Sequence, residues 1–570
     1  MVSSENRSAT RQALIGKLKE IVGKRHVLTN ARSTRSFRTG YRYGGGKILA
    51  VVRPGTLVEQ WRAFCAAVEA DVVVIVQAAN TGLTGGSTPF GNDYDREVVV
   101  INTLRIDRID FIGDGHQVLC LAGSTLHRLQ EKLAHIGRDP HSVIGSTTIG
   151  ASVIGGICNN SGGALIHRGP AFTQMALFAR VDEDGTVRLV NHLGIELGDS
   201  AEEILCRLDR GDYGVKDVEL DSAKLASDPD YEGLIRDVDA TSPARFNNDQ
   251  RLLYEASGSA GKLCVFAVRL DTFAKPDSSK VFYVGSNDYL ELTRLRRHVL
   301  TSFVNLPVAA EYLHRSAYDL AEIYGKDIYI FLKLFGSARI STAFKLKSWL
   351  DGLTDRLGLG YNVSDKFLQL IVGLLPNHLP ERMNTFRSTY EHHLLLRTAG
   401  AGIEEMRSCL SSMMPSRTGD FFECDDDEAD AALRHRYAVG GACVRYRAVQ
   451  SSVVGDVVAL DVALPRNAED WRETVPPEVE EHIEKRSIYG HFFCHVFHYD
   501  YAVKKGVDWL TVEHRLVRDL EQRGVELPSE HNVGHLYLAK PNLAEFYRSL
   551  DPTNTLNPGI GQTSKRKHWA

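Results

Sequence analysis

The sequence predicts an α+β protein of several domains, and three observations support this. Its 570 residues are enough for about three or four domains of ordinary size. The first half is rich in short runs of β-branched residues that are separated by turns. Residues 311–390 follow a mostly helical period that glycine and proline interrupt.

The chain begins with a polar stretch and an amphipathic helix, after which a strand–helix–strand unit is expected. Residues 48–53 (ILAVVR) and 72–77 (VVVIVQ) have the length and the β-branching of strands, and residues 58–70 between them form an amphipathic helical pattern. This order predicts a βαβ unit with a right-handed crossover. Further strands are expected at residues 98–102, 118–122, 178–181 and 263–270.

The later part of the chain alternates charged and apolar segments. Residues 205–250 are highly charged and poor in large apolar residues, which indicates a surface excursion. Four consecutive acids, Asp425 to Glu428, follow a predicted strand, a placement that suits the positive end of a helix dipole. The expected elements are strands at residues 281–284, 421–424, 457–464 and 489–497, and a helix at residues 289–303.

Charge and cysteine content exclude several function classes. The formal net charge of −5 and the pI near 6.5 argue against a nucleic-acid-binding protein. The nine cysteines include no CxxC pair, which argues against zinc fingers and redox motifs and fits reduced cytosolic thiols. The N-terminus lacks a secretory apolar region, and no apolar run approaches the ~20 residues that span a bilayer. The chain is therefore not expected to be an integral membrane protein.

Two glycine-rich segments are suited to close contact between the backbone and a ligand. They are residues 77–87 (QAANTGLTGGS) and residues 145–163 (GSTTIGASVIGGICNNSGG). Glycine lacks the Cβ that would block a ligand, so runs of amides can point at a phosphate. The segments contain no GxxxxGK[ST] motif and no GxGxxG turn that opens a helix near the first strand. A cofactor with a diphosphate is therefore expected to bind in another type of fold.

These two loops and RPGT at residues 53–56 resemble the FAD-binding domain of the vanillyl-alcohol-oxidase (PCMH-type) flavoproteins. Five later segments are similar to the bacterial quinone-dependent D-lactate dehydrogenases, and this likeness runs over nearly the whole chain. They are VNHLGIELG (190–198), AGKLCVFAVRLDTF (260–273), YEHHLLLR (390–397), SEHNVGHLY (529–537) and DPTNTLNPGIGQTSKRKHW (551–569).

The resemblance implies a two-part PCMH-type FAD-binding domain, an α+β cap domain and a mainly helical membrane-facing insertion. The implied limits are residues 1–271 for the FAD domain, 272–313, 391–425 and 451–520 for the three parts of the cap, 314–390 for the helical membrane-facing region, 426–450 for a basic membrane-facing segment, and 521–570 for a C-terminal segment that returns to the FAD domain.

The resemblance also implies which residues hold FAD, which we expect to be bound non-covalently. Amides and hydroxyl groups of the first loop would face the diphosphate, and an apolar side chain would lie against a ring of the cofactor. The implied contacts are Ala78, Ala79, Asn80, Thr81, Gly82, Gly86 and Ser87 in the first loop, followed by Gly145, Ser152, Gly162 and Val265.

The activity implied by the resemblance is the oxidation of D-lactate to pyruvate by hydride transfer to FAD, with electrons passed to a membrane quinone. The alternatives are another substrate, such as 2-hydroxyglutarate, glycolate or an aryl alcohol, and a non-catalytic flavin-binding module. Histidine suits the base that removes the hydroxyl proton. His531 matches the active-site histidine of the family, and Glu530 matches a carboxylate that is a metal ligand in many relatives.

The run YGHFFCHVFHYDY at residues 489–501 contains two further candidates. Broader flavin 2-hydroxy-acid dehydrogenases carry H-x-G-x-G-N-x-H with both histidines on a divalent metal. His491 and His498 keep this separation, but Phe493, His495 and Val496 replace the interior glycines and asparagine. With Glu530 the two histidines can form a zinc-like site with an open position, or they can hold the substrate directly. We favour direct contact with the substrate and no bound metal.

Positively charged side chains are expected to bind the substrate carboxylate and the anionic membrane surface. Arginine presents a planar fork of donors, so Arg445 is the first candidate for the carboxylate, with Arg397 and His393 as alternatives. The protein is expected to dock peripherally on the cytoplasmic face of the bacterial inner membrane. Basic clusters that can contact anionic phospholipid lie at residues 292–298, 433–449 and 565–567.

Overall fold

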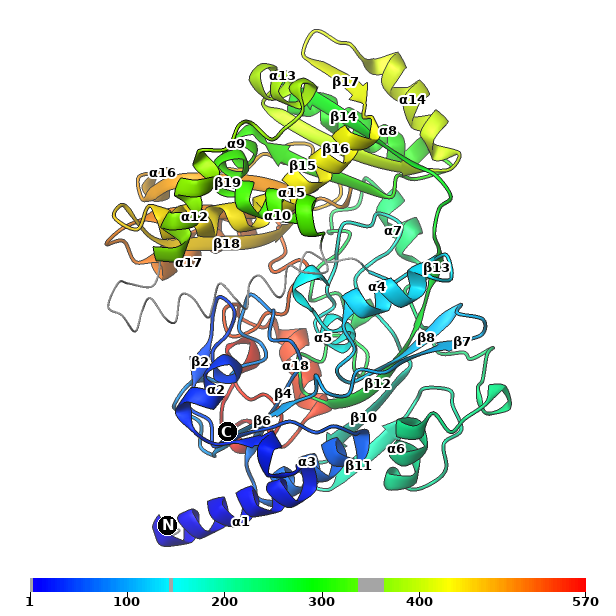
Figure 1. The fold of residues 1–570 in the computed structure, drawn as a ribbon, viewed down its shortest axis with the longest axis vertical. Helices are drawn as coiled ribbons and strands as arrows, with labels where there is room; N and C mark the ends of the chain where they lie inside the picture. Colours follow the sequence, from blue (N-terminus) through cyan, green and yellow to red (C-terminus); the bar gives the residue numbers. More distant parts are fainter. Residues whose placement is uncertain (1–3, 143–146, 337–362) are drawn as a thin grey trace.

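The structure is a computed structural model that describes residues 4–142, 147–336 and 363–570. Figure 1 shows two bodies, a lower one that contains both chain ends and an upper one that contains the later strands. We call them the FAD body and the cap. The limits given above for the individual domains stay a prediction.

The FAD body contains the predicted βαβ unit. Strand β3 (Ala50–Val52), helix α3 (Leu57–Glu69) and strand β4 (Val73–Gln77) follow one another, and the Thr56 side chain caps α3 by accepting from the Glu59 amide. β3 and β4 are not neighbours, because both pair in parallel with β6 (Val98–Asn102), which lies between them. Antiparallel β1 (Val27–Leu28) completes a four-stranded sheet of order β1-β3-β6-β4.

A second sheet of five antiparallel strands completes this body. It includes the strands predicted near residues 118, 178 and 263. Its order is β11 (Val187–Asn191), β10 (Ala176–Val181), β12 (Cys264–Asp271), β8 (Gln117–Leu121) and β7 (Ile109–Ile112). One apolar core contains side chains of both sheets and of α3. The glycine-rich loops are therefore attached to a rigid scaffold.

The cap is built on a seven-stranded antiparallel sheet. Its order is β17 (Gly419–Glu423), β14 (Ser279–Ser286), β16 (His392–Ala399), β15 (Ala309–His314), β19 (Ile483–His491), β20 (Val496–Lys504) and β18 (Val454–Ala463). Helices α8 (Tyr289–Ser302), α14 (Gly402–Met413) and α17 (Trp509–Gln522) share a core with one face of the sheet. Helices α9 (Arg315–Tyr324) and α15 (Asp426–Val449) share a second core with the other face.

The remaining described helices and strands surround these sheets. The predicted helical region continues after α9 in α10, α12 and α13, while residues 337–362 lie outside the described residues. The bounds are α1 (Ser4–Val22), α2 (Ala31–Arg38), β2 (Gly45–Gly46), β5 (Phe90–Gly91), α4 (Leu126–Ala134), β9 (Arg138–Asp139), α5 (Val153–Cys158), α6 (Ala201–Arg210), α7 (Tyr231–Arg236), β13 (Phe273–Ala274), α10 (Lys326–Phe335), α12 (Val363–Gly373), α13 (Glu381–Thr389), α16 (Pro477–Glu480) and α18 (Pro541–Leu550).

Two expectations about the organisation of the chain are wrong. Residues 489–497 do not form one strand, because β19 ends at His491, a 3-10 turn covers Phe492–Cys494, and β20 begins at Val496. His495 allows the reversal by adopting a left-handed conformation with φ 54°. Residues 205–250 are not purely a surface excursion, because Tyr231 and Arg245 within them are buried.

The predicted basic segment is also different from expectation. Helix α15 starts with the expected acids, and Asp425 and Glu428 form a capping box. Its arginines do not present a free cationic face, because each is paired with a carboxylate. The pairs are Arg434 with Asp430, Arg436 with Glu311, Arg445 with Asp327 and Asp365, and Arg447 with Asp456.

The C-terminal segment returns to the FAD body, where Figure 1 shows it in red. The amide of Val74 donates to the Thr555 carbonyl at 2.9 Å, and the amide of Asn557 donates to the Val74 carbonyl at 2.9 Å. This segment therefore extends the first sheet, and residues just before it in the chain reach the boundary between the two bodies.

Candidate active site

A β-hairpin brings His491 and His498 together. The β19–β20 register pairs His498 with Tyr489, and His491 lies two residues beyond Tyr489, so both histidines share one face of the sheet. Their ring centroids are 5.3 Å apart. The hairpin therefore places the two histidines of the interrupted motif next to each other, although no single strand or helix carries both residues.

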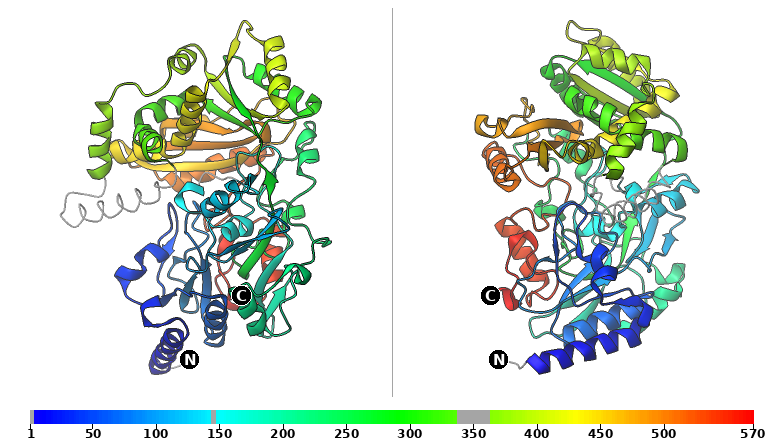
Figure 2. Two further views of the ribbon diagram at one scale, coloured as in Figure 1. Left: turned by 45° about the vertical axis from the view of Figure 1, so that its right-hand side comes forward. Right: turned by 60° about the vertical axis from the view of Figure 1, so that its left-hand side comes forward.

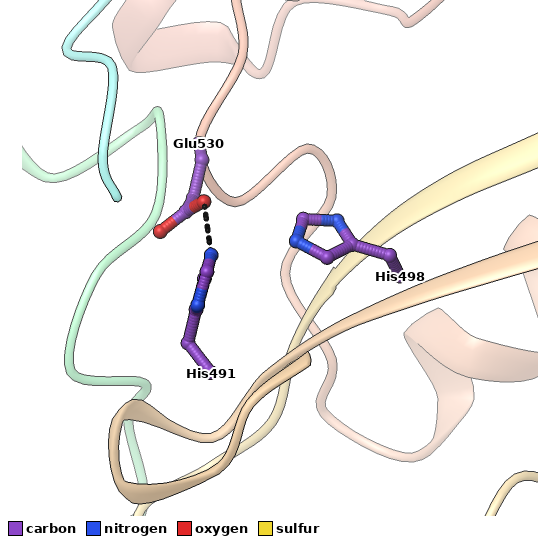
Figure 3. Close-up of side chains that lie close together, drawn as sticks. All are labelled: His491, His498 and Glu530. Atoms are coloured by element: carbon purple, nitrogen blue, oxygen red, sulfur yellow. Dashed lines mark ion pairs between the residues drawn. The ribbon is translucent and has the colours of Figure 1, made fainter. Parts of the chain in front are cut away.

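Glu530 of the C-terminal segment completes this group, as Figure 3 shows. Its Oε2 lies 3.4 Å from His491 Nε2, and one ligand atom from each of the three residues lies within 4.8 Å of the others. The second glycine-rich loop passes beside it, because a Cβ on Gly162 would lie 2.5 Å from Glu530 Oε1. A glycine is therefore required where the carboxylate meets this loop.

A carboxylate from a neighbouring strand supports each histidine. Glu311 on β15 lies 2.6 Å from His491 Nδ1, and Asp461 on β18 lies 3.3 Å from His498 Nδ1. Asp461 also accepts from the Glu530 amide at 2.6 Å and lies 3.8 Å from His531 Nε2. The His531 side chain is 34% exposed, so it is the most accessible imidazole of the cluster.

Arg245 holds Glu530 from the other side. Its side chain is fully buried and its Nη1 donates to Glu530 Oε1 at 2.9 Å. The same guanidinium donates to the carbonyl groups of Gly163 and Leu165 and to Cys494 Sγ. One side chain thus joins the glycine-rich loop, the tip of the cap hairpin and the C-terminal segment.

Arg436 on α15 brings a second guanidinium to the cluster. Its Nε lies 2.7 Å from Glu311 Oε2, and its Cζ lies 4.8 Å from the ring centroid of Tyr489. Nε makes this ion pair without hydrogen-bond geometry, and Arg436 has no other ion pair among the described residues. A planar fork of this kind suits a substrate carboxylate.

The pKa values of the cluster follow from these pairs. Burial alone would lower the pKa of His491, but Glu311 and Glu530 together raise it to about 10. Burial alone would raise the pKa of Glu530, but His491 and Arg245 hold it well below its ordinary value. Burial likewise opposes ionisation of Asp461, whose pKa His531 and His498 nevertheless lower. At neutral pH the carboxylates are therefore charged and His491 is an imidazolium.

The donor set fits a divalent cation in its composition. Two imidazoles and one carboxylate are ordinary ligands of such an ion, and Glu311 and Asp461 hold the second ring nitrogens as outer carboxylates do in metal sites. Protein groups, however, already pair with two of the carboxylates. Glu530 faces Arg245 and His491, and Glu311 faces Arg436 and His491, while Asp461 faces His498.

The three side chains proposed for the substrate carboxylate are not brought into this cluster. Arg445 pairs with Asp327 and, at 3.0 Å, with Asp365, and it lies nine residues or about 13 Å beyond Arg436 along α15. His393 is fully buried between tyrosine rings. Arg397 is exposed at the other end of β16. Arg436, nine residues earlier on the same helix, is the arginine that reaches the cluster.

The first predicted FAD loop follows β4 and is not fully buried. Residues 78–82 and 86–87 are half-buried or exposed, and a Cβ on Gly82 would meet no atom within 4 Å. Asn80 takes a positive φ of 55°, and its amide donates to the Thr39 carbonyl at 2.9 Å. The loop is therefore held in shape by the protein while one side of its backbone stays open to a ligand.

The later FAD positions lie on the wall between the loops and the core. Ser152 caps α5 by accepting from the Gly155 amide at 3.0 Å, and Val265 is buried in β12. Gly162 lies against Glu530, as described above. Gly145 lies outside the described residues. The positions that can be seen fit a flavin bound between the second loop and the histidine cluster.

Several residues of the site were missed by the sequence reasoning. Glu311 and Asp461 are single acids within otherwise apolar strands, AAEYLH and VVALDVAL, and that pattern is a usable signal. Arg436 is one of four arginines in residues 433–449, and the sequence gives no reason to select it. Arg245 lies in a charged stretch that resembles surface, so no local signal marks it.

Comparison with known proteins gives matches over the whole chain. A family model described as "D-lactate dehydrogenase, membrane binding" matches residues 281–569, and one described as "FAD binding domain" matches residues 48–191. The quinone-dependent D-lactate dehydrogenase of Haemophilus influenzae is 52% identical over 561 residues, which is 98% of this chain and 99% of the relative. That of Escherichia coli is 51% identical over 98% of both chains.

Solved structures of lower identity share the fold. An alkyldihydroxyacetonephosphate synthase has a TM-score of 0.59 at 12% identity, covering 96% of this chain and 84% of its own. A p-cresol methylhydroxylase has a TM-score of 0.57 at 10% identity, covering 98% and 97%. These likenesses show that the chain has the PCMH-type flavoprotein fold expected from its sequence.

Proposed function

This chain belongs to the family of quinone-dependent D-lactate dehydrogenases, and we propose that its reaction takes place at the cluster of His491, His498, Glu530 and His531. The enzyme oxidises D-lactate to pyruvate with FAD and passes the electrons to a quinone. The observation that carries the proposal is the meeting of these residues beside Gly162, the family's flavin-loop position. The match to the relatives favours D-lactate over another 2-hydroxy acid or a non-catalytic flavin module.

His531 is the proposed general base. When bound, FAD supplies the acceptor for the hydride of the substrate Cα; we propose that it is held non-covalently by residues 78–82, 86–87, 152, 162 and 265. His491 cannot accept the hydroxyl proton at neutral pH, because its pKa is raised to about 10. His531 is more exposed and has Asp461 at 3.8 Å to stabilise the imidazolium that forms.

Arg436 and the His491 imidazolium are the proposed anchors of the lactate carboxylate. Both touch Glu311, so their charges are fixed in place before substrate arrives. Substituting Arg436→Met is expected to raise the KM for D-lactate at least tenfold, whereas Arg445→Met on the same helix should lower stability and leave KM near the wild-type value. The reverse pattern of KM values would restore Arg445 as the anchor.

We propose that the cluster contacts the substrate directly, without a metal. The support is that the Arg245 and Arg436 guanidinium groups already pair with Glu530 and Glu311, so these carboxylates do not need a divalent ion to balance their charge. Metal analysis of the purified holoenzyme should find far less than one equivalent of any divalent metal, and chelation should leave activity intact. A stoichiometric metal whose removal abolishes activity would contradict this part of the proposal.

We propose that contact with the membrane is mainly apolar. The protein is a peripheral membrane protein, and no described helix is long and apolar enough to cross a bilayer. Helix α10 packs against α12, and the two helices together with the residue that follows α12 expose large apolar side chains: Leu334, Phe335, Phe367, Leu370, Ile371 and Leu374 are 44–82% exposed. This patch is what a lipid surface would cover.

Charge is proposed to add little to this docking. The arginines of α15 are paired, and Arg294 and Arg297 in the basic cluster of α8 pair with Asp288 and Asp239. Attraction to anionic phospholipid is therefore a secondary proposal. We place the membrane contact on the cytoplasmic face, and the nine cysteines, all free, are consistent with a reducing compartment.

A further inference from the structure

A row of side chains runs across the cap sheet from the active site into its interior. The register pairs Asp461 with His498, His498 with Tyr489, Tyr489 with Leu313, and Leu313 with His393. Directly opposed residues of antiparallel strands point to the same face, so all five lie on the face that α9 and α15 cover. His393 is two strand spacings, or about 10 Å, from Tyr489.

At the inner end of this row, buried polar atoms have no hydrogen-bond partner among the described residues. His393 is fully buried, and neither of its ring nitrogens has a hydrogen-bond partner among the described residues. The hydroxyl groups of Tyr318 on α9 and Tyr283 on β14 are buried and unpartnered in the same way. Their rings lie 5.4 and 5.9 Å from that of His393. Buried polar groups are rarely left unpaired, so we take three such side chains, with both tyrosine rings next to His393, as the sign of a ligand.

Further aromatic and imidazole rings lead from these atoms toward the proposed membrane face. The Tyr318 ring lies 4.3 Å from that of His435 on α15, and beyond it His378 lies 4.4 Å from Tyr329 on α10. Tyr329 belongs to the buried side of α10, whose outer side carries the exposed Leu334. The polar atoms therefore lie between the active-site end of the sheet and the helices that would contact lipid.

We infer that His393, Tyr318 and Tyr283 form the binding site for the head group of the membrane quinone. The inference rests on the proposed function, because it concerns the electron acceptor of that reaction. A quinone ring is apolar and carries two carbonyl oxygens, which can accept from a tyrosine hydroxyl group and a neutral imidazole. Burial lowers the pKa of His393 to about 3, so this imidazole is neutral and offers one donor and one acceptor.

The unprotonated ring nitrogen of His393 can also bind the reduced form of the quinone. D-Lactate loses a hydride from its α-carbon and a proton from its hydroxyl group, which amount to two electrons and two protons. A quinone that gains two electrons and two protons becomes a hydroquinone, so lactate and quinone give pyruvate and hydroquinone in balance. The hydroquinone hydroxyl groups donate, and the bare nitrogen of His393 can accept one of them.

The test compares two buried tyrosines in the detergent-solubilised holoenzyme. Tyr318→Phe removes an unpartnered hydroxyl group, whereas Tyr312→Phe, on the other face of the sheet, removes one that lies 2.8 Å from His392 Nδ1. Calorimetric titration with a short-chain benzoquinone should give a Kd about tenfold higher for Tyr318→Phe, the effect of one lost hydrogen bond. The Kd of Tyr312→Phe should equal that of the wild type. His393→Phe should also raise the Kd about tenfold.

Two further readouts separate this inference from the proposed function. Ferricyanide-linked D-lactate oxidation should be unchanged in Tyr318→Phe, because this acceptor does not need the quinone site. Without quinone, the Tm of Tyr318→Phe should stay level or rise, while that of Tyr312→Phe should fall. An unchanged quinone Kd in Tyr318→Phe, or a fall in Tm as large as that of Tyr312→Phe, would overturn the inference. Absence of ferricyanide-linked D-lactate oxidation in the wild type would instead overturn the proposed function.

Discussion

Glu530 is fixed by two cations that come from different parts of the chain. His491 of the cap and Arg245 of the FAD body lie on its two sides, at 3.4 and 2.9 Å. Removing one partner of such a buried pair commonly costs about 3–5 kcal/mol, because the other charge is left buried. The ionisation of the cluster therefore depends on the two bodies being docked.

The His491 pairs predict a specific dependence of stability on pH. Its pKa is raised to about 10 in the folded protein, so its contribution is complete below the unfolded value near 6.5 and is lost as pH rises toward 10. The depressed pKa of Glu530 acts oppositely: its contribution is complete above about 4.5 and is lost at lower pH. Thermal unfolding of the wild type should thus show a decline in Tm between pH 6.5 and 10 that His491→Gln lacks. Parallel declines in both proteins would contradict the assignment.

Arg245 predicts a change in activity that a general loss of packing would not give. Lysine keeps the charge but cannot serve Glu530, two carbonyl groups and Cys494 together. Arg245→Lys should lower kcat about tenfold or more and move the acid limb of kcat/KM to higher pH, because the Glu530 carboxylate loses its fixed donor.

Arg296 provides the matched control for this experiment. It is equally buried and donates to the carbonyl groups of Phe493 and Arg466 at 3.1 and 3.0 Å, but it makes no contact with Glu530. Arg296→Lys should lower Tm without moving the acid limb. If both variants shift the pH profile equally, Arg245 has only a structural role.

At this scale, motif reasoning identified three histidines and Glu530 but not the residues that hold them in place. His491, His498, Glu530 and His531 were found because motif spacing and family likeness mark them. Glu311, Asp461 and Arg245 come from three separate segments and meet only through strand pairing and domain docking. Arg445, His393 and Arg397 lie away from the cluster, and the sequence around a cationic side chain does not show whether it faces the site.

Helices α10 and α12 are the elements whose surface least resembles that of a freely soluble protein. Leu370 on α12 and Leu374 just after the end of that helix are 66% and 82% exposed, and Leu334 on α10 is 67% exposed. Fully covering a leucine side chain with lipid is worth about 1.5–3 kcal/mol, so a few such residues suffice for reversible membrane binding. The paired arginines of α15 contribute little by comparison.

Introducing negative charge on this apolar face should release the protein from membranes. Leu374→Glu, alone and with Leu334→Glu, should shift the protein from the pellet to the supernatant when it is sedimented with vesicles of neutral phospholipid. Val215→Glu, at an 82% exposed position of the FAD body, is the control and should bind as the wild type does. Wild-type protein should be released by detergent and not by high salt. Release by salt alone would favour the basic clusters instead.

Sequence patterns were reliable for strands and failed at the hairpin. The β-branched runs before residue 270 correspond to β3, β4, β6, β8, β10 and β12. Residues 489–497 were expected to be one strand because aromatic residues fill it. No glycine or proline marks the turn there, and His495 supplies the left-handed conformation that those residues usually provide.

At the scale of the whole molecule, the candidate active site lies between the FAD body and the cap. Figure 2 shows the cap above the FAD body, with the C-terminal segment in red against the latter. The FAD body contributes the glycine-rich loops and Arg245, the cap contributes His491 and His498, and the C-terminal segment contributes Glu530 and His531. Family likeness was enough to predict this fold. The contacts that join the bodies were beyond prediction, because they connect residues hundreds of positions apart.

The most direct test of the account is anaerobic reduction of the bound flavin, followed by its visible absorbance. In the wild type, D-lactate should bleach the flavin bands rapidly and L-lactate should not. His531→Gln should keep its FAD and slow the bleaching by D-lactate about 10²–10⁴-fold, the usual contribution of a general base. Bleaching by L-lactate at the same rate, or an unchanged rate in a His531→Gln protein that retains FAD, would contradict the account.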